Sequence, residues 1–361
     1  MSGSKLEPVL AHIDANIEIA TEHLFDLLRI PSISTDPNFK VDCDTAADWL
    51  VQDLKSIGFD ASKRTTPGHP MVLAHAGDRG IHLMFYGHYD VQPVDPLGLW
   101  DSPPFEPVLE SGDLGPVIRA RGVSDDKGQL MTFVEACRSW KAVHGNLPGK
   151  ISLFFEGEEE SGSPSLVPFM TENSAELTAD IALICDTGLF GNNTPGIVTR
   201  LRGMLGEELT ITGPSKDLHS GMYGGVAINP ARILAKIIST LHDENGRITI
   251  PGFYDGVPEL SPEISEQWDG LNFDTAGFLD QVGLSKLAGE HGRTALEMIW
   301  SRPTCEVNGI WGGYTGLGFK TVLPSHASAK ISFRLVGTQD PNNIRDNFRA
   351  VVQSMLPPDC T

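Results

Sequence analysis

The stretch IHLMFYGH, residues 81–88, is almost entirely apolar on both faces and stops at a glycine followed by a histidine. A short run of this kind is typical of a strand buried inside a parallel sheet. ISLFFEG (151–157) and DIALICD (180–186) repeat the pattern. Segments with helical spacing of apolar residues accompany these strands, at 5–29, at 45–57 and after Lys127. The alternation predicts an α/β fold with a mixed, largely parallel sheet and helices on both faces.

The sequence changes character after Pro195. Two strand-like and two helix-like segments follow: GEELTIT (206–212), a helix near 229–242, KISFRLV (330–336) and a helix near 341–355. A loop-rich stretch up to about residue 290 comes after the first of these helices. We interpret these four segments as parts of a strand–helix–strand–strand–helix order, which predicts a small α+β domain, ferredoxin-like in plan. We therefore expect one domain over residues 1–197 and a second, inserted domain over 198–361.

Charge and composition exclude several classes of protein. The 361 residues contain 47 Asp plus Glu against 27 Lys plus Arg, and this net charge of −20 argues against a nucleic-acid partner. No window approaches 18 uninterrupted apolar residues, so we expect no membrane span. The first residues carry charges throughout, and the five cysteines are scattered without a CxxC pair, so the expected location is the cytoplasm.

Polar side chains stand at the end of each expected strand of the first domain. They are His88 and Asp90, the run from Glu156 to Glu160, and Asp186. Ligands of open α/β sheets bind at the carboxyl ends of the strands. The three strand ends therefore predict one site.

The first of these motifs is GHYDVQP, residues 87–93. Residues i and i+2 of an extended segment share a face, so Asp90 can orient His88 as a metal ligand. A histidine satisfied by an aspartate in an ordinary turn is the simpler interpretation of this motif alone.

The second motif, RGVSDDKGQ (121–129), places two aspartates before a glycine and a helix. Adjacent carboxylates repel unless a cation lies nearby. One aspartate is explained as a helix N-cap, and Lys127 could neutralise either of them, so this motif alone is only suggestive.

The third motif, FFEGEEESGS (154–163), has four glutamates in five positions directly after a buried strand. A charge run is usually a solvated face. The alternative is that Glu160 binds a metal and Glu159 acts as general base. One histidine and several carboxylates suit Zn²⁺, Mn²⁺ or Co²⁺. No GxSxG motif and no glycine-rich phosphate loop occurs.

Taken in order, these motifs resemble the co-catalytic di-zinc metallopeptidase and amidohydrolase family, which includes carnosinase-like dipeptidases, aminoacylases and glutamate carboxypeptidases. The matching segments span nearly the whole chain: LLRIPSIS, GHYDVQP, RGVSDDKG, EGEEESGS, CDTG, DLHSGMYGG and KTVLP. YGHYDVQP, WDSPPFEP (100–107) and the aspartate at 186 favour the dipeptidase branch.

The resemblance implies a role for each residue of the site. His88 and Asp186 correspond to ligands of the first metal, Asp125 to the aspartate that bridges both metals, and Glu160 to a ligand of the second. Glu159 corresponds to the general base that acts on a metal-activated water, and Asp90 to the residue that orients His88.

The resemblance also implies that the second domain is a lid through which the chain forms a homodimer. His219, in DLHSG, is similar to the histidine that reaches into the partner's site and stabilises the oxyanion, and Thr321 is expected to join it. Arg334, in SFRLV, resembles the arginine that binds a substrate carboxylate. Without the resemblance, His219 is a loop residue and Arg334 a charge at the edge of a strand.

One departure from the family concerns the last histidine ligand of the second metal, which the family supplies after the lid. No later histidine follows here, so we expect a truncated chain that binds the second metal weakly. The leading interpretation is hydrolysis of dipeptides or small peptides. The alternatives are an N-acyl amino acid amidohydrolase and a catalytically impaired dimerising module.

Overall fold

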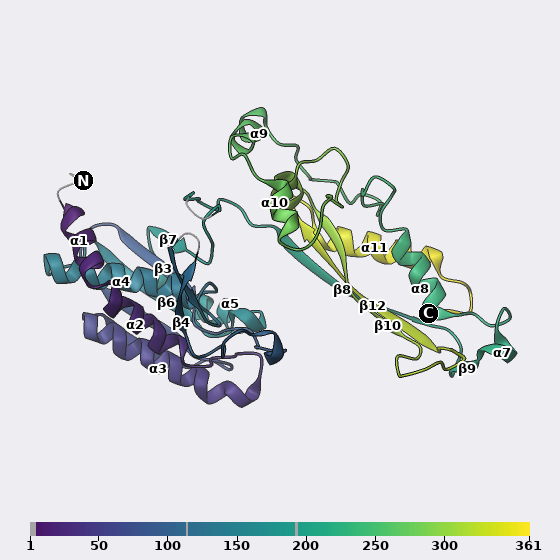
Figure 1. The fold of residues 1–361 in the computed structure, drawn as a ribbon, viewed down its shortest axis with the longest axis horizontal. Coiled ribbons are helices and arrows are strands. Elements are labelled where there is room, and N and C mark those ends of the chain that lie inside the picture. The colour runs from purple at the N-terminus through teal and green to yellow at the C-terminus, as the bar shows by residue number, and fades with distance from the viewer. Residues whose placement is uncertain (1–4, 113–114, 192–193) are drawn as a thin grey trace. The chain divides into compact units, whose positions relative to one another are not determined.

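The computed structural model describes residues 5–112, 115–191 and 194–361. The polypeptide divides into two compact units, Met1–Ile197 and Val198–Thr361, and each is described by itself (Figure 1). Among the described residues, no helix is both long and apolar enough to cross a membrane.

The first unit is built on a five-stranded sheet with the order β1-β2-β6-β3-β7. Its strands are β1 (Asp60–Arg64), β2 (Met71–Ala76), β3 (His82–His88), β6 (Lys150–Glu156) and β7 (Ile181–Ile184). The sheet is mixed, as expected. The parallel pairings join β6, β3 and β7, whereas β1–β2 and β2–β6 are antiparallel. A separate hairpin pairs β4 (Val108–Gly112) with β5 (Gly115–Arg119).

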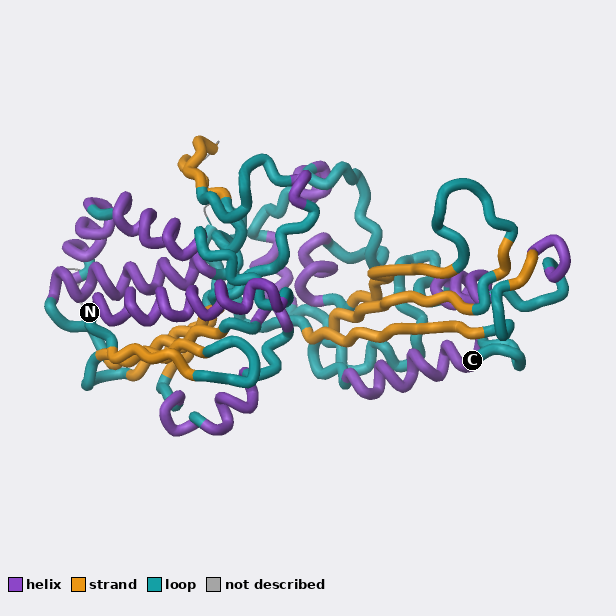
Figure 2. The backbone as a smooth tube through the Cα atoms, turned by 90° about the horizontal axis from the view of Figure 1, so that it is seen from below, coloured by secondary structure: helices purple, strands orange, loops and turns teal. Residues whose placement is uncertain are grey.

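Helices cover both faces of this sheet, which confirms the expectation and is visible in Figure 2. Successive side chains of a strand point to opposite faces. Leu153 and Phe155 of β6 therefore pack with α3 and α4, whereas Phe154 packs with α5 and α6. The helices are α1 (Glu7–Ala15), α2 (Ile17–Leu28), α3 (Lys40–Ile57), α4 (Lys127–His144), α5 (Leu166–Glu172) and α6 (Ser174–Leu177).

Two helix boundaries differ from the sequence expectation. The helix expected over 5–29 is interrupted at Asn16, which separates α1 from α2. α3 begins at Lys40, five residues earlier than expected, and ends at Ile57, where Gly58 caps it. Gly58 has a positive φ of 85°, the left-handed conformation in which glycine is the usual residue.

The second unit has a three-stranded antiparallel sheet with the order β10-β12-β8. α8 and α11 pack on one face of it, through Leu234, Ile237, Ile344 and Phe348. The strands β8 (Gly203–Thr212), β10 (Thr304–Gly312) and β12 (His326–Leu335) and the helices α8 (Pro230–Ser239) and α11 (Pro341–Met355) follow the expected strand–helix–strand–strand–helix order. Smaller elements complete the unit: β9 (Leu218–His219), α7 (Ser220–Tyr223), α9 (Pro262–Asp269), α10 (Thr275–Asp280), a π-helix (Glu297–Ser301) and β11 (Val322–Leu323).

Candidate metal centre

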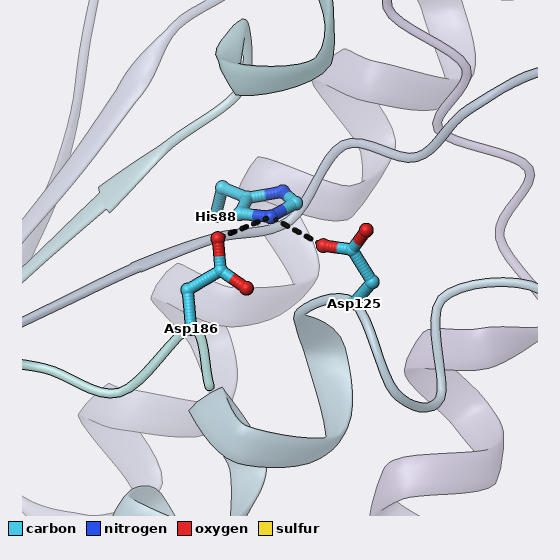
Figure 3. Close-up of side chains that lie close together, drawn as sticks. All are labelled: His88, Asp125 and Asp186. Atoms are coloured by element: carbon cyan, nitrogen blue, oxygen red, sulfur yellow. Dashed lines mark hydrogen bonds and ion pairs between the residues drawn. The ribbon is translucent and has the colours of Figure 1, made fainter. Parts of the chain in front are cut away.

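His88, Asp125 and Asp186 bring their side chains together at the carboxyl end of the parallel strands (Figure 3). The register of the sheet explains the position. His88 is the last residue of β3, and Asp186 lies two residues beyond the pair Tyr86–Ile184 of β3 and β7. His88 Nε2 lies 3.0 Å from Asp125 Oδ1 and 3.7 Å from Asp186 Oδ2. One possible ligand atom from each residue lies within 4.8 Å of the others, so the three could share one ion.

Asp90 is fully buried and connects two parts of this site. Its Oδ1 lies 3.4 Å from His88 Nδ1 and accepts the backbone N–H of Glu159, while its Oδ2 accepts the N–H of Glu160. Nδ1 of His88 also lies 3.1 Å from the Asp90 carbonyl oxygen. A carbonyl can only accept, so Nδ1 carries the proton, and in the neutral ring Nε2 is free to bind a metal.

The two adjacent aspartates have different environments. Asp125 is exposed and faces His88, whereas Asp126 is buried and accepts the backbone N–H of His88 through Oδ2 at 3.1 Å. Asp126 occupies the N-cap position of α4, but its side chain forms no capping hydrogen bond, so the capping interpretation is wrong. Burial raises the pKa of Asp126 to about 7, although the backbone N–H and the charge of His88 act to lower it.

Lys127 neutralises neither aspartate, which corrects the second interpretation of that motif. Its side chain is fully buried, and Nζ donates to the carbonyl oxygens of Leu27 and Ile30, at 3.0 and 2.8 Å. Burial lowers the pKa of this ammonium to about 7. Lys127 therefore attaches the start of α4 to the end of α2 instead of balancing the charge of the site.

The glutamate run is not a solvated face. Glu156 and Glu158 are buried, at 0% and 3% exposure. Glu156 accepts the hydroxyl of Tyr86, and Glu158 accepts the backbone N–H groups of His69 and Ser165, at 3.0 and 3.2 Å. Both glutamates belong to the run of strand-end carboxylates expected from the sequence, which gave neither of them a role of its own. Their position at the end of a buried strand and just beyond it is the signal that could have identified them.

Glu159 and Glu160 are half-buried beside the three-residue cluster. Burial raises the pKa of Glu159; the charge of His88 lowers it, and that of Asp186 raises it further. Burial likewise raises the pKa of Glu160, although its hydrogen bond from Gln92 lowers it. Burial also opposes protonation of His88, but Asp90, Asp126 and Glu159 outweigh it and raise the His88 pKa to about 10. Such a concentration of carboxylates around one imidazole is the environment that a divalent cation stabilises.

Comparison with known proteins identifies the family. A model described as the peptidase dimerisation domain matches residues 199–360. Cys-Gly metallodipeptidase dug1 of Schizosaccharomyces pombe is 31% identical over 358 residues, which cover 95% of this chain and 74% of that protein. An M20 family metallo-carboxypeptidase structure from Sulfolobus solfataricus is 34% identical, with a TM-score of 0.81 over 95% of this chain and 77% of that one. The chain belongs to the M20 metallopeptidase family.

Two further M20 relatives are dipeptidases by name. The structure of the dipeptidase Dug1p from Saccharomyces cerevisiae superposes with a TM-score of 0.83 at 27% identity, over 100% of this chain and 79% of that one. Human Beta-Ala-His dipeptidase is 27% identical over 349 residues, 92% of this chain and 68% of that protein. Membership makes the chain a metal-dependent hydrolase and agrees with a nitrogen-plus-carboxylate cluster at the strand ends.

His219, Thr321 and Arg334 all lie in the second unit of this M20 metallopeptidase. His219 pairs with Val322 where β9 meets β11, and the N–H of Ser220 donates to the carbonyl oxygen of Thr321 at 2.9 Å. This β9–β11 pair lies near the start of β12, where the N–H of Gly213 donates to the carbonyl oxygen of Ser325. Arg334 lies near the opposite end of β12. Eight residues of extended strand separate His326 from Arg334, roughly 27 Å.

Proposed function

We propose that this M20 metallopeptidase hydrolyses the peptide bond of dipeptides. The observation that carries the proposal is the cluster of His88, Asp125 and Asp186 at the strand ends, with Glu159 beside it. The named similarity to several dipeptidases supports the substrate class.

The donor set fits a divalent ion of the Zn²⁺, Mn²⁺ or Co²⁺ type, and Zn²⁺ is our choice. His88, Asp125 and Asp186 would hold one ion, and Asp125 with Glu160 would hold a second. Glu160 is not one of the three clustered residues, so its share in a second ion rests on the family resemblance. A divalent ion in this place supplies polarisation of a carbonyl and activation of water.

The residues of the chain supply the proton transfers. Glu159 accepts the proton of the attacking water and delivers it to the leaving amine, a role that its raised pKa favours. Asp90 fixes the backbone of Glu159 and the ring of His88. The general base Glu159 and the metal ligand His88 are therefore held in one position relative to each other. Arg334 binds the substrate carboxylate.

The first test is hydrolysis by the full chain. The chain is treated with a chelator and reloaded with Zn²⁺, and the release of amino acids is measured with dipeptides and with N-acetyl amino acids in parallel. We expect metal-dependent cleavage of dipeptides and its loss in Glu159→Ala, while the exposed control Glu172→Gln keeps the parent rate. Faster cleavage of N-acetyl amino acids would favour an aminoacylase instead, and no cleavage of either substrate would refute a hydrolytic function.

We further propose that the enzyme is a cytoplasmic homodimer in which the first unit is catalytic and the second is a lid. The separation of His219 and Thr321 from Arg334 along β12 supports this arrangement. A single small substrate cannot touch both ends of that strand, so we propose that His219 and Thr321 serve a different site from Arg334, and on the family resemblance we assign His219 and Thr321 to the site of the partner subunit.

Mixing two inactive variants tests the shared site. If His219 acts in the partner's site, Glu159→Ala mixed with His219→Ala regains part of the parent activity, because hybrid dimers contain one intact site. The control mixture of Glu159→Ala with the double variant Glu159→Ala/His219→Ala stays inactive. No recovery in the first mixture, with hybrid dimers shown by a different affinity tag on each variant, would contradict the proposal.

A further inference from the structure

One face of the three-stranded sheet of the second unit is covered by α8 and α11, and Arg334 stands on the other face. Phe333 and Leu335 point into the core, whereas Arg334 between them is exposed. Arg334 pairs directly with Met204 of β8, so these two side chains share the uncovered face.

Arg202 extends the same face beside Arg334. It precedes Met204 by two residues, and the pair Gly203–Leu335 continues the ladder to the start of β8. Alternate residues of an extended segment share a face, and diagonal neighbours lie within reach of long side chains. Burial lowers the pKa of Arg202, and the positive charge of Arg334 lowers it further, which agrees with two neighbouring guanidinium groups.

Neither guanidinium has an acidic partner among the residues that the structure describes. Other arginines of this unit are paired: Arg293 with Glu259, Arg302 with Glu290, and Arg345 with Glu207. Arg202 is half-buried, and a cation withdrawn from water beside a like charge is unfavourable unless an anion binds there. Arg202 and Arg334 therefore offer positive charge and N–H donors without an acidic partner among the described residues, as expected of a site that binds an anion.

We propose that Arg202 acts together with Arg334 to bind the C-terminal carboxylate of the peptide substrate. This inference rests on the proposed peptidase function and adds Arg202 as a residue that determines specificity. Two planar guanidinium forks offer parallel N–H donors to both oxygens of one carboxylate. The enzyme then selects peptides with a free carboxylate over their C-terminal amides.

The direct test is binding, measured by isothermal titration calorimetry on the full Zn²⁺-loaded chain. The probe is a ketomethylene analogue of a dipeptide, which cannot be hydrolysed, as the free acid and as the C-terminal amide. We expect the parent to bind the acid at least ~10-fold more tightly than the amide, the range of hydrogen bonds to charged groups. Arg202→Gln should lose most of this preference, and Arg202→Lys should keep part of it, because lysine retains the charge without the fork.

Arg232→Gln is the matched control, because Arg232 is an exposed arginine of α8, the helix on the covered side of the sheet. It removes the same charge and should keep the parent preference. Arg334→Gln and the double variant Arg202→Gln/Arg334→Gln complete a double-mutant cycle. The double variant should lose little more of the preference for the free acid than either single variant does. Circular dichroism confirms that each variant is folded.

The outcomes separate this inference from the proposed function. An Arg202→Gln variant that keeps the parent preference for the acid overturns the inference, as does a parent that binds acid and amide equally or binds neither. A parent that binds the acid preferentially but hydrolyses no dipeptide would refute the proposed function and leave the arginine pair in place.

Discussion

Asp90 contacts three parts of the candidate metal centre with one carboxylate: the ring of His88 and the backbone of Glu159 and Glu160. Asp90→Asn keeps the size but puts an amide N–H where only an acceptor fits. We expect Zn²⁺ affinity to fall by about 10- to 100-fold, the usual effect of losing a partner of a metal ligand. Zn²⁺ titration of the chelated variant measures this.

The control for Asp90→Asn is Asp180→Asn. Asp180 accepts the N–H of His82 at the other end of β3, so this variant also loses a carboxylate that accepts a backbone N–H. It should bind Zn²⁺ as the parent does. Equal affinities of Asp90→Asn and the parent would mean that Asp90 does not position the site.

Ser152 links two histidines inside the sheet of the first unit. Its hydroxyl lies 2.8 Å from His75 Nδ1 and 2.6 Å from His82 Nε2, and its side chain is almost fully buried. A hydroxyl has one proton, so it donates to one ring and accepts from the other. Ser152→Ala leaves both nitrogens without this partner and should lower the free energy of unfolding by about 1–3 kcal/mol. Urea denaturation measures the change, and exposed Ser111→Ala should be near neutral; equal values for the two variants would refute the link.

Ion pairs stabilise the loop-rich segment that joins α8 to β10. Arg302 and Glu290 are nearly buried, with 4% and 10% side-chain exposure, and the guanidinium of Arg302 also lies 5.4 Å from the centre of the Tyr254 ring. Burial alone would raise the pKa of Glu290, but the bonds and charge of Arg302 lower it below the ordinary value of 4.5. This contribution to stability is therefore present above that value and is lost as the pH falls through the lower pKa of the folded state.

Glu290→Gln should destabilise the protein at neutral pH by up to about 3–5 kcal/mol, because the buried charge of Arg302 then keeps only the longer, 3.4 Å contact with exposed Glu259 among the ion pairs of the described residues. The difference between parent and variant should shrink as the pH falls below 4.5. Urea unfolding at several pH values measures it, with exposed Glu263→Gln as control. A difference that does not change with pH would contradict the pairing.

The elements that sequence patterns predicted well have local signals. β3, β6 and β7 are continuous apolar runs, and α8 and α11 each begin with a capping Asn or Asp followed by proline. The meeting of His88 and Asp186 also followed from strand ends alone, whereas Asp125 was singled out only by the family resemblance. The partners of Lys127 and the contact of Glu158 with His69 could not be predicted, because those partners lie about 100 and 90 residues away in the chain. The antiparallel β2–β6 pairing likewise depends on the whole sheet.

At the scale of the whole molecule, each unit has its own hydrophobic core. Leu50 is fully buried in the core of the first unit, and Phe348 is almost fully buried in that of the second. Phe348→Ala should cost about 3–5 kcal/mol and Leu50→Ala about 2–5 kcal/mol. If the units unfold separately, hydrogen exchange should show each loss of protection confined to the unit that carries the substitution. Loss of protection across both units in either variant would show that they unfold as one.

The central claim is that His88, Asp125 and Asp186 hold the metal on which hydrolysis depends. The most direct measurement is the Zn²⁺ content of the dialysed chain and of His88→Gln, by mass spectrometry, with dipeptide hydrolysis on the same samples. His82→Gln, at the other end of β3, is the control. We predict bound Zn²⁺ and activity in the parent and the control, and the loss of both in His88→Gln. A His88→Gln chain that retains its Zn²⁺ and its activity would contradict the account.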